Sequence, residues 1–342
     1  MVKFMSLSSG SCGNCYYLGT ENGGIIIDAG VSLRRLKKVL QEYDMTYDSF
    51  SAVLVTHDHL DHISHLGSFC KRLNKPVYTT ETIHSALARH TFTAPTIAPC
   101  RRILAEGEWN EVAGMKVRYF VVPHDATQTV GYAIEVEGHK FVIMTDVGRM
   151  TDEAVEFARQ ADTVVVESNY DMDMLMSGPY TYELKMRIVQ GCGHLSNDEC
   201  ASAIKRFWHP ALKNIFLCHL SENNNTRDLA FNCSLAALQE LGVKKGDLSL
   251  RCLPRQYPSG FHCCVCAASG HCRGRYGHQY RPVYSRGHLC SQDLRKSSAS
   301  LWQRRTEKKY TCPEKPDRHR HTCGSKKCYH LCWGYGGASR CQ

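Results

Sequence analysis

The chain has 342 residues, of which 43% are hydrophobic, enough for one large domain or two ordinary ones with a substantial core. No run approaches the ~18 apolar residues of a membrane span, and the N-terminus is too short and strand-like for a signal peptide. These features predict a cytoplasmic protein without membrane contact. The net charge of +9 comes from residues 262–342, which carry 16 Lys and Arg against 4 Asp and Glu. Residues 1–261 carry 26 against 29, so attraction to phosphates there must be local or come from bound metal.

Short β-branched runs alternate with amphipathic segments up to about residue 258. The expected strands are residues 24–28, 51–55, 115–122, 132–136, 139–145, 163–167 and 214–218. The expected helices are roughly residues 31–43, 62–73, 81–89, 151–160, 180–190, 197–208 and 226–241. Because strands come in hairpin-like groups as well as alternating with helices, the pattern predicts an α/β (α+β) fold of two mixed sheets with helices outside.

The composition changes abruptly after this region. We expect residues 1–258 to form one domain and residues 259–342 to form a tail rich in Cys, His and Arg. Residues 262–342 contain no Ile, Phe, Met or Asn, and therefore no plausible apolar core. Three interpretations stay open: a zinc-binding appendage, a basic tail that binds nucleic acid, and a disordered extension translated past a disrupted reading frame. The abrupt break favours the last.

Residues 56–62 (THDHLDH) form the most informative segment. They follow the apolar run 51–55 and place four candidate metal ligands within six positions: His57, His59, Asp61 and His62. A strand that ends in a loop of imidazoles and a carboxylate can hold two divalent cations. Such cations lower the pKa of a bound water and polarise a reacting oxygen, so the segment predicts a hydrolase.

Three further candidate ligands each follow the end of an expected strand: His124, Asp146 and His219. Together with the first cluster they complete a site for two metal ions. The expected arrangement is two trios and a bridging carboxylate: His57, His59 and His124; Asp61, His62 and His219; and Asp146 between them. Imidazole and carboxylate ligands without thiolate suit Zn or Mn.

This pattern resembles the metallo-β-lactamase superfold over residues 1 to about 258, through the HxHxDH segment at 57–62 and the later ligands in order. The resemblance implies an αββα sandwich with the metal site on one rim. Asp146 stands where the antibiotic-cleaving members typically carry Cys, which disfavours β-lactam hydrolysis.

Other segments narrow the resemblance. Glu167 resembles the Glu-containing strand end of the phosphodiesterase branch, and residues 193–196 (GHLS) and 218–221 (CHLS) resemble His-containing motifs of tRNA-processing and related nucleases. The opening residues 8–14 (SSGSCGN) resemble the start of the WalJ (YycJ)-type exonuclease family. That resemblance implies 5′-to-3′ exonuclease activity, with DNA as the nucleic-acid partner.

Catalytic roles follow from this chemistry. Asp61 is placed to accept a proton from a water between the metals that attacks phosphorus. His194 is the candidate for contacting the phosphate or protonating the leaving oxygen, and Glu167 for orienting its imidazole. A plain helix-entry role for His194 stays open, because Ser196 and Glu199 match a capping box. For Glu167 the alternative is a solvated acid at a strand end.

Two supporting features lie earlier in the chain. Asp28 is expected to fix a loop or support a ligand rather than bind metal itself. Residues 11–14 fit either amide donors near the metals or an ordinary hairpin turn.

Two other functions fit parts of the sequence. The seven ligands alone fit a glyoxalase II-like thioesterase or another small-molecule hydrolase on the same scaffold. The chain also fits a non-enzymatic platform whose tail binds nucleic acid or zinc. The pair of Glu167 and His194 favours the phosphodiesterase, because a thioesterase has no evident need for it.

Overall fold

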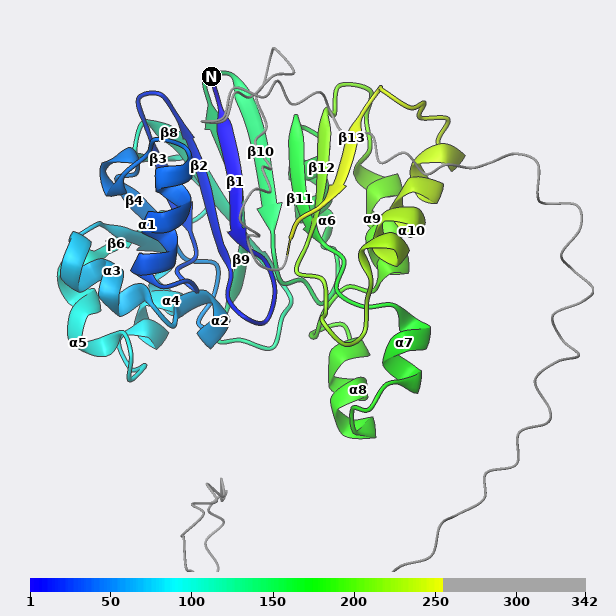
Figure 1. Cartoon of the computed structure of the whole chain (residues 1–342), viewed down its shortest axis with the longest axis horizontal. Helices are drawn as coiled ribbons and strands as arrows, with labels where there is room; N and C mark the ends of the chain where they lie inside the picture. The colour runs from blue at the N-terminus through cyan, green and yellow to red at the C-terminus, as the bar shows by residue number, and fades with distance from the viewer. Residues whose placement is uncertain (255–342) are drawn as a thin grey trace, which may run out of the picture. The chain divides into compact units, whose positions relative to one another are not determined.

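The computed structural model describes residues 1–254. Two β-sheets lie face to face, and helices cover their outer faces (Figure 1). Both sheets are mixed, which confirms the predicted two-sheet α/β sandwich. The interpretations of the tail at residues 259–342 lie outside the described residues.

The first sheet has six strands in the order β1-β2-β3-β4-β5-β6. Their bounds are β1 (Lys3–Ser8), β2 (Cys15–Thr20), β3 (Gly23–Ile27), β4 (Ala52–Leu54), β5 (Val77–Thr79) and β6 (Arg101–Ile103). β2 runs antiparallel to both β1 and β3, and β3 to β6 are parallel. The carboxyl ends of β1 and of β3 to β6 therefore lie at one edge.

The second sheet has seven strands in the order β13-β12-β11-β10-β9-β8-β7. Their bounds are β7 (Asn110–Val112), β8 (Met115–Val122), β9 (Thr129–Val136), β10 (His139–Met144), β11 (Thr163–Glu167), β12 (Asn214–Cys218) and β13 (Ser249–Cys252). β10 to β13 are parallel, and β9 is antiparallel to both β8 and β10. The carboxyl ends of β8 and of β10 to β13 consequently share an edge.

Helices pack on both outer faces of the sandwich (Figure 1). On the first sheet lie α1 (Leu33–Glu42), α3 (Leu66–Leu73), α4 (Glu81–Leu87) and the short α5 (Ala94–Ile97). On the second lie α6 (Asp152–Ala158), α9 (Asn197–Phe207) and α10 (Arg227–Glu240), and α7 (Met172–Ser177) and α8 (Tyr182–Val189) lie beyond its edge. Within residues 1–254, no helix has the length and apolar character needed to cross a bilayer.

One predicted helix is divided in two. The expected helix at 62–73 consists of α2 (Leu60–Ile63) and α3, separated at His65, whose φ of −111° and ψ of 0° are not helical. The break lets the backbone N–H of His65 donate to the carbonyl oxygen of Ala29 at 3.1 Å. The contact holds the loop that carries the first histidine cluster against the end of β3. Periodicity alone does not reveal such a tertiary contact.

The core explains why the central strands are continuous apolar runs. On β11, Val164 and Val166 pack among the helices and Val165 packs toward the first sheet. Such a strand is buried on both faces. Between the sheets, the ring of Phe4 on β1 lies 5.7 Å from the ring of Phe141 and 5.5 Å from that of Phe216, measured between centroids. Phe4 thus joins the two sheets.

Replacing this ring should weaken the whole sandwich. We expect Phe4→Ala to lower the free energy of unfolding by about 3–5 kcal/mol, because it leaves a cavity between the sheets. Denaturant unfolding of the full chain followed by circular dichroism measures the change. Phe92→Ala is the control, since Phe92 is 60% exposed and should change stability by no more than about 0.5 kcal/mol. Equal losses for both variants would contradict the assigned core.

Candidate metal centre

The predicted ligands gather where strands of both sheets end. His57 comes shortly after β4, His124 after β8 and Asp146 after β10, and His219 directly follows β12. The two sheets also touch at this edge, because the backbone N–H of His219 donates to Oγ of Ser9, just beyond β1, at 2.9 Å. One rim of the sandwich therefore carries the whole set.

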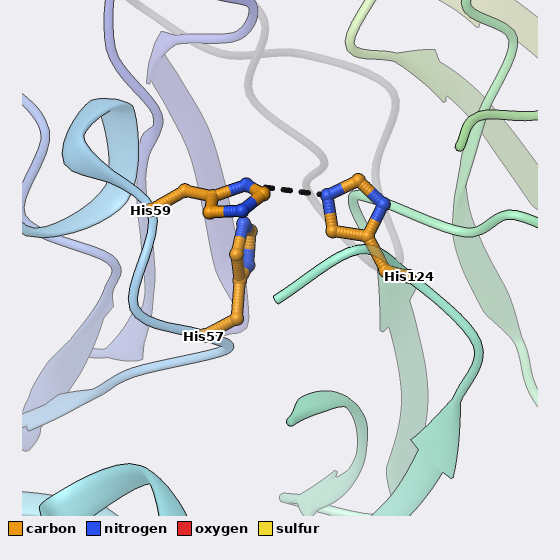
Figure 2. A group of neighbouring side chains, drawn as sticks. All are labelled: His57, His59 and His124. Atoms are coloured by element: carbon orange, nitrogen blue, oxygen red, sulfur yellow. Dashed lines mark hydrogen bonds between the residues drawn. The ribbon is translucent and has the colours of Figure 1, made fainter. Parts of the chain in front are cut away.

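A first group consists of three imidazoles, His57, His59 and His124. Figure 2 shows them turned toward one another, two from the loop after β4 and one from the loop after β8. Ring centroids lie 4.7 to 5.2 Å apart, and Nδ1 of His59 lies 3.3 Å from Nε2 of His124. The buried Nε2 of His57 has no hydrogen-bond partner among residues 1–254. An inward-facing trio with an orphaned nitrogen could hold a metal ion.

The outer nitrogens of this group are held by backbone carbonyls. Nδ1 of His124 donates to the carbonyl oxygen of Gly193 at 2.7 Å, and Nε2 of His59 donates to that of Asp125 at 3.2 Å. Because a carbonyl only accepts, these contacts place the protons on the outer nitrogens. The inner nitrogens keep their lone pairs for a metal, which is the usual support of a ligating imidazole.

A second group consists of Asp61, His62 and His219. Oδ2 of Asp61 lies 3.5 Å from Nε2 of His62 and 3.5 Å from Nε2 of His219. Both imidazoles are buried, whereas the Asp61 side chain is 23% exposed. This trio could hold a second ion beside the first.

Asp28, which the sequence predicts to fix a loop or support a ligand, contacts His62 of the second group. Its Oδ2 lies 2.7 Å from Nδ1 of His62, and the carboxylate also accepts hydrogen bonds from the backbone N–H and the hydroxyl of Thr56 at 2.8 and 2.9 Å. The carboxylate is fully buried, at a residue with a left-handed φ of 62°. Nε2 of His62 is therefore the nitrogen that faces the metal centre.

Asp146 lies between the two groups. One carboxylate oxygen lies 3.1 Å from Nε2 of His62, and the other lies 3.8 Å from Nε2 of His124 and 3.4 Å from Nδ1 of His219. Burial alone would raise the pKa of Asp146, but the imidazoles of His219 and His62 outweigh burial and hold that pKa well below its usual value. An ionised carboxylate between two imidazole groups has the position and charge that a bridging ligand needs.

Glu167 is fully buried, so the alternative of a solvated acid at the end of β11 is wrong. Its Oε1 lies 2.8 Å from Nδ1 of His194 and 2.9 Å from Nδ1 of His219. Its Oε2 accepts the backbone N–H groups of Val147 at 2.8 Å and Leu195 at 3.3 Å. Since both oxygens are already engaged, Glu167 fits a carboxylate that orients two imidazoles better than it fits a further metal ligand.

His194 enters the rim from the loop before α9. Its ring centroid lies 5.0 Å from that of His124 and 5.2 Å from that of His219, and its side chain is 23% exposed. Burial would lower the pKa of His194, but the Glu167 carboxylate more than offsets it and raises that pKa. The predicted capping box of Ser196 and Glu199 is also present, so the helix-entry role and the place at the rim coexist.

The sequence left the contribution of residues 11–14 open, and the structure shows what Asn14 contacts. Nδ2 of this buried residue lies 3.1 Å from Oδ2 of Asp61 and 2.8 Å from Nε2 of His62. The sequence also did not predict the role of Asp58, whose carboxylate accepts the N–H and hydroxyl of Thr127 at 3.1 and 2.6 Å. Such long-range partners have no local sequence signal.

The donor set fits a dinuclear metal site. Within each of the two trios the candidate ligand atoms lie within 4.8 Å of one another, and Asp146 belongs to further groups that link them. All the donors are imidazole nitrogens or carboxylate oxygens, and no cysteine among residues 1–254 joins such a group.

Comparisons with known proteins agree with this geometry. Residues 24–213 match the family model described as beta-lactamase superfamily domain. The chain is 32% identical over 246 residues to exodeoxyribonuclease YycJ of Bacillus anthracis. The aligned region covers 72% of this chain and 92% of that protein. It is also 32% identical over 228 residues to exodeoxyribonuclease WalJ of Streptococcus pneumoniae, covering 67% and 85%.

A solved structure shares the fold. Zn²⁺-bound PqqB from Methylobacterium extorquens superposes with a TM-score of 0.55 at 17% identity, over 73% of this chain and 98% of that one. With matches of this extent in both sequence and fold, the chain belongs to the metallo-β-lactamase superfamily and is a metal-dependent hydrolase homologous to the YycJ and WalJ exodeoxyribonucleases.

Proposed function

We propose that the protein is a dinuclear-metal-dependent phosphodiesterase that degrades DNA as a 5′-to-3′ exonuclease. The observation that carries the proposal is the buried Glu167 carboxylate, which holds His194 at the rim beside both ligand groups. A positioned imidazole can contact a phosphate or protonate a leaving oxygen. The names of the relatives YycJ and WalJ, both exodeoxyribonucleases, support DNA as the substrate.

The metal ligands are assigned as two trios with one bridging carboxylate. They are His57, His59 and His124 for one ion, Asp61, His62 and His219 for the other, and Asp146 between them. Imidazole and carboxylate donors suit Zn or Mn, and the Zn²⁺-bound state of PqqB supports zinc. When bound, two such cations supply an activated water and positive charge for the phosphate oxygens.

Asp61 is suited to accept the proton of the attacking water. Burial would raise the pKa of its carboxyl, but the imidazoles of His62 and His219 outweigh burial and keep that pKa low. The carboxylate is therefore ionised at neutral pH. With 23% of its side chain exposed, it remains accessible from the solvent side of the rim.

His194 is suited to donate a proton. Its Nδ1 faces Glu167, so Nε2, on the other side of the ring, is the nitrogen that would face substrate. Because the carboxylate raises the pKa of His194, the imidazolium form is favoured. His194 would donate a proton to the leaving oxygen as the bond to phosphorus breaks.

The first test is metal-dependent hydrolysis of DNA. The full chain supplied with Mn²⁺ or Zn²⁺ should release nucleotides from 5′-phosphorylated duplex DNA, and His59→Ala and Asp61→Ala should abolish release. His65→Ala is the control, because His65 follows the same cluster but belongs to no ligand group. Thioesters and β-lactams are assayed in parallel. Hydrolysis of thioesters without release of nucleotides would establish the alternative small-molecule hydrolase.

Loss of the Asp28 carboxylate should weaken metal binding without removing a ligand. We expect Asp28→Ala to reduce the affinity of the second group by about 10- to 100-fold, because His62 loses the partner that fixes its tautomer. Metal titrations followed by the thermal midpoint of unfolding measure the change. Asp58→Ala is the matched control, since Asp58 also accepts hydrogen bonds from a threonine but none from an imidazole. Equal losses of metal affinity in the two variants would contradict the assigned role of Asp28.

Substitutions of Glu167 and His194 should differ in their effects on metal affinity. We expect His194→Ala to lower kcat by about 10²- to 10⁴-fold with unchanged metal affinity. Glu167→Gln should lower both, because Oε1 also contacts His219. His209→Ala is the control, since its Nε2 bonds the carbonyl of Ala161 away from the rim.

A substrate with sulfur in place of the leaving oxygen distinguishes proton donation from a structural effect. A thiolate leaves without protonation, so this substrate should restore much of the rate of His194→Ala. An unchanged defect on the sulfur substrate would exclude His194 as the acid.

A further inference from the structure

A groove of about 730 Å³ lies between α1 and α3, and its lining includes none of the proposed metal ligands. Four exposed cations line it: Arg34, Lys37, Lys38 and Arg72. We call this surface the basic groove. No carboxylate among residues 1–254 lines it, and the remaining lining side chains are apolar or uncharged. The four positive charges therefore face a common space.

The charge of the basic groove contrasts with that of the surrounding domain. Residues 1–254 carry 25 Lys and Arg against 29 Asp and Glu, yet residues 33–42 and 66–75 together carry seven against one. Within the part of the chain that the structure describes, none of the four lining cations forms an ion pair. Their mutual repulsion is thus not relieved internally, and an external anion would relieve it.

The spacing of the cations suits a polymer with regularly spaced negative charges. Arg34, Lys37 and Lys38 stand at positions i, i+3 and i+4 of α1, so they share one face of the helix. They extend over about 6 Å of the helix axis, comparable with the rise of about two nucleotides along one DNA strand. Arg72 on α3 adds a fourth positive charge to the lining of the same groove.

Both helices that form the basic groove begin at the metal centre. α1 follows the turn at Gly30, whose N–H donates to the carbonyl of Asn14 at 2.9 Å. A Cβ at Gly30 would lie 1.8 Å from the carbonyl oxygen of Asp61, so only glycine allows this turn to pack under the ligand loop. α3 begins shortly after His62, at Leu66. The N-terminal ends of α1 and α3 therefore both lie next to the loop that carries the first ligands.

We propose that the basic groove binds the phosphate backbone of the DNA substrate outside the metal centre. This inference rests on the proposed nuclease function and adds a second point of attachment for the substrate. A small anion would need only one or two of these charges, whereas a polynucleotide engages the whole row and releases several counterions.

The test is a charge-neutralising variant and a control with the same change in net charge. Arg34→Gln/Lys37→Gln/Lys38→Gln removes the row from the basic groove. Lys116→Gln/Lys140→Gln/Lys244→Gln removes three exposed charges elsewhere on the domain. Both are made in the full chain and checked by circular dichroism and thermal unfolding. The assays measure kcat/KM for a 30-nucleotide DNA and for a dinucleotide across a range of salt concentrations.

We expect the groove variant to lose about tenfold or more in kcat/KM on the 30-nucleotide DNA relative to the dinucleotide. The slope of log kcat/KM against log salt should become shallower by about two, since each lost phosphate contact removes about 0.7 to 0.9. The control variant should retain the wild-type length dependence. Equal changes in both variants, or an unchanged slope in the groove variant, would overturn the proposal.

Binding without catalysis separates this inference from the proposed function. Fluorescence anisotropy of the same DNA with chelator-treated full chain should show weaker binding for the groove variant only, even if DNA is not hydrolysed. Hydrolysis of DNA by the wild type with no such difference would retain the nuclease and reject the groove. Competition by inorganic phosphate or by polyglutamate as effective as that by DNA would instead identify a small-anion or acidic-protein site.

Discussion

A single buried carboxylate, Asp28, joins the end of β3 to the loop that carries four of the seven proposed ligands. It directly follows β3, accepts two hydrogen bonds from Thr56 after β4, and contacts Nδ1 of His62 on α2. A buried charge is costly unless it is paired and fully hydrogen-bonded, so each contact constrains the others. The left-handed φ of 62° at Asp28 is tolerated because these contacts fix the turn. Loss of this carboxylate would remove the partner of His62 and the two hydrogen bonds that fix Thr56, next to His57.

The opposite side of the rim is organised by the same principle. Glu167 is buried at the end of β11 and contacts both His194 and His219. His219 has a left-handed φ of 52°, held by the bond of its N–H to Ser9 and of its carbonyl to Asn169. One carboxylate thus orients an imidazole assigned to the metal and an imidazole assigned to the substrate. Under the proposed assignment, a substitution at Glu167 should therefore alter metal binding and proton transfer together.

Whether a feature could be predicted from the sequence depends on how far apart its interacting residues lie in the chain. The expected strand at residues 115–122 has the bounds of β8, because alternation within one strand is a local property. The seven proposed ligands come together at one rim, since residues after strand ends share an edge whenever the strands are parallel. The break in the expected helix 62–73 and the contact of Asn14 with Asp61 depend on residues far apart in the chain. No pattern within a single segment encodes such contacts.

The distribution of charge over residues 1–254 bears on the proposed substrate, because DNA is a polyanion. An excess of carboxylates over residues 1–254 repels DNA from most of the surface, and this repulsion falls off within about 10 Å at moderate salt. Within residues 1–254, we expect attraction at the proposed metal sites on the rim and at the basic groove between α1 and α3. Repulsion from the rest of residues 1–254 would then favour orientations in which a DNA strand approaches along α1 and α3. A uniformly basic surface would bind DNA more tightly but in many unproductive registers, whereas the two proposed local sites would favour one path to the metal centre.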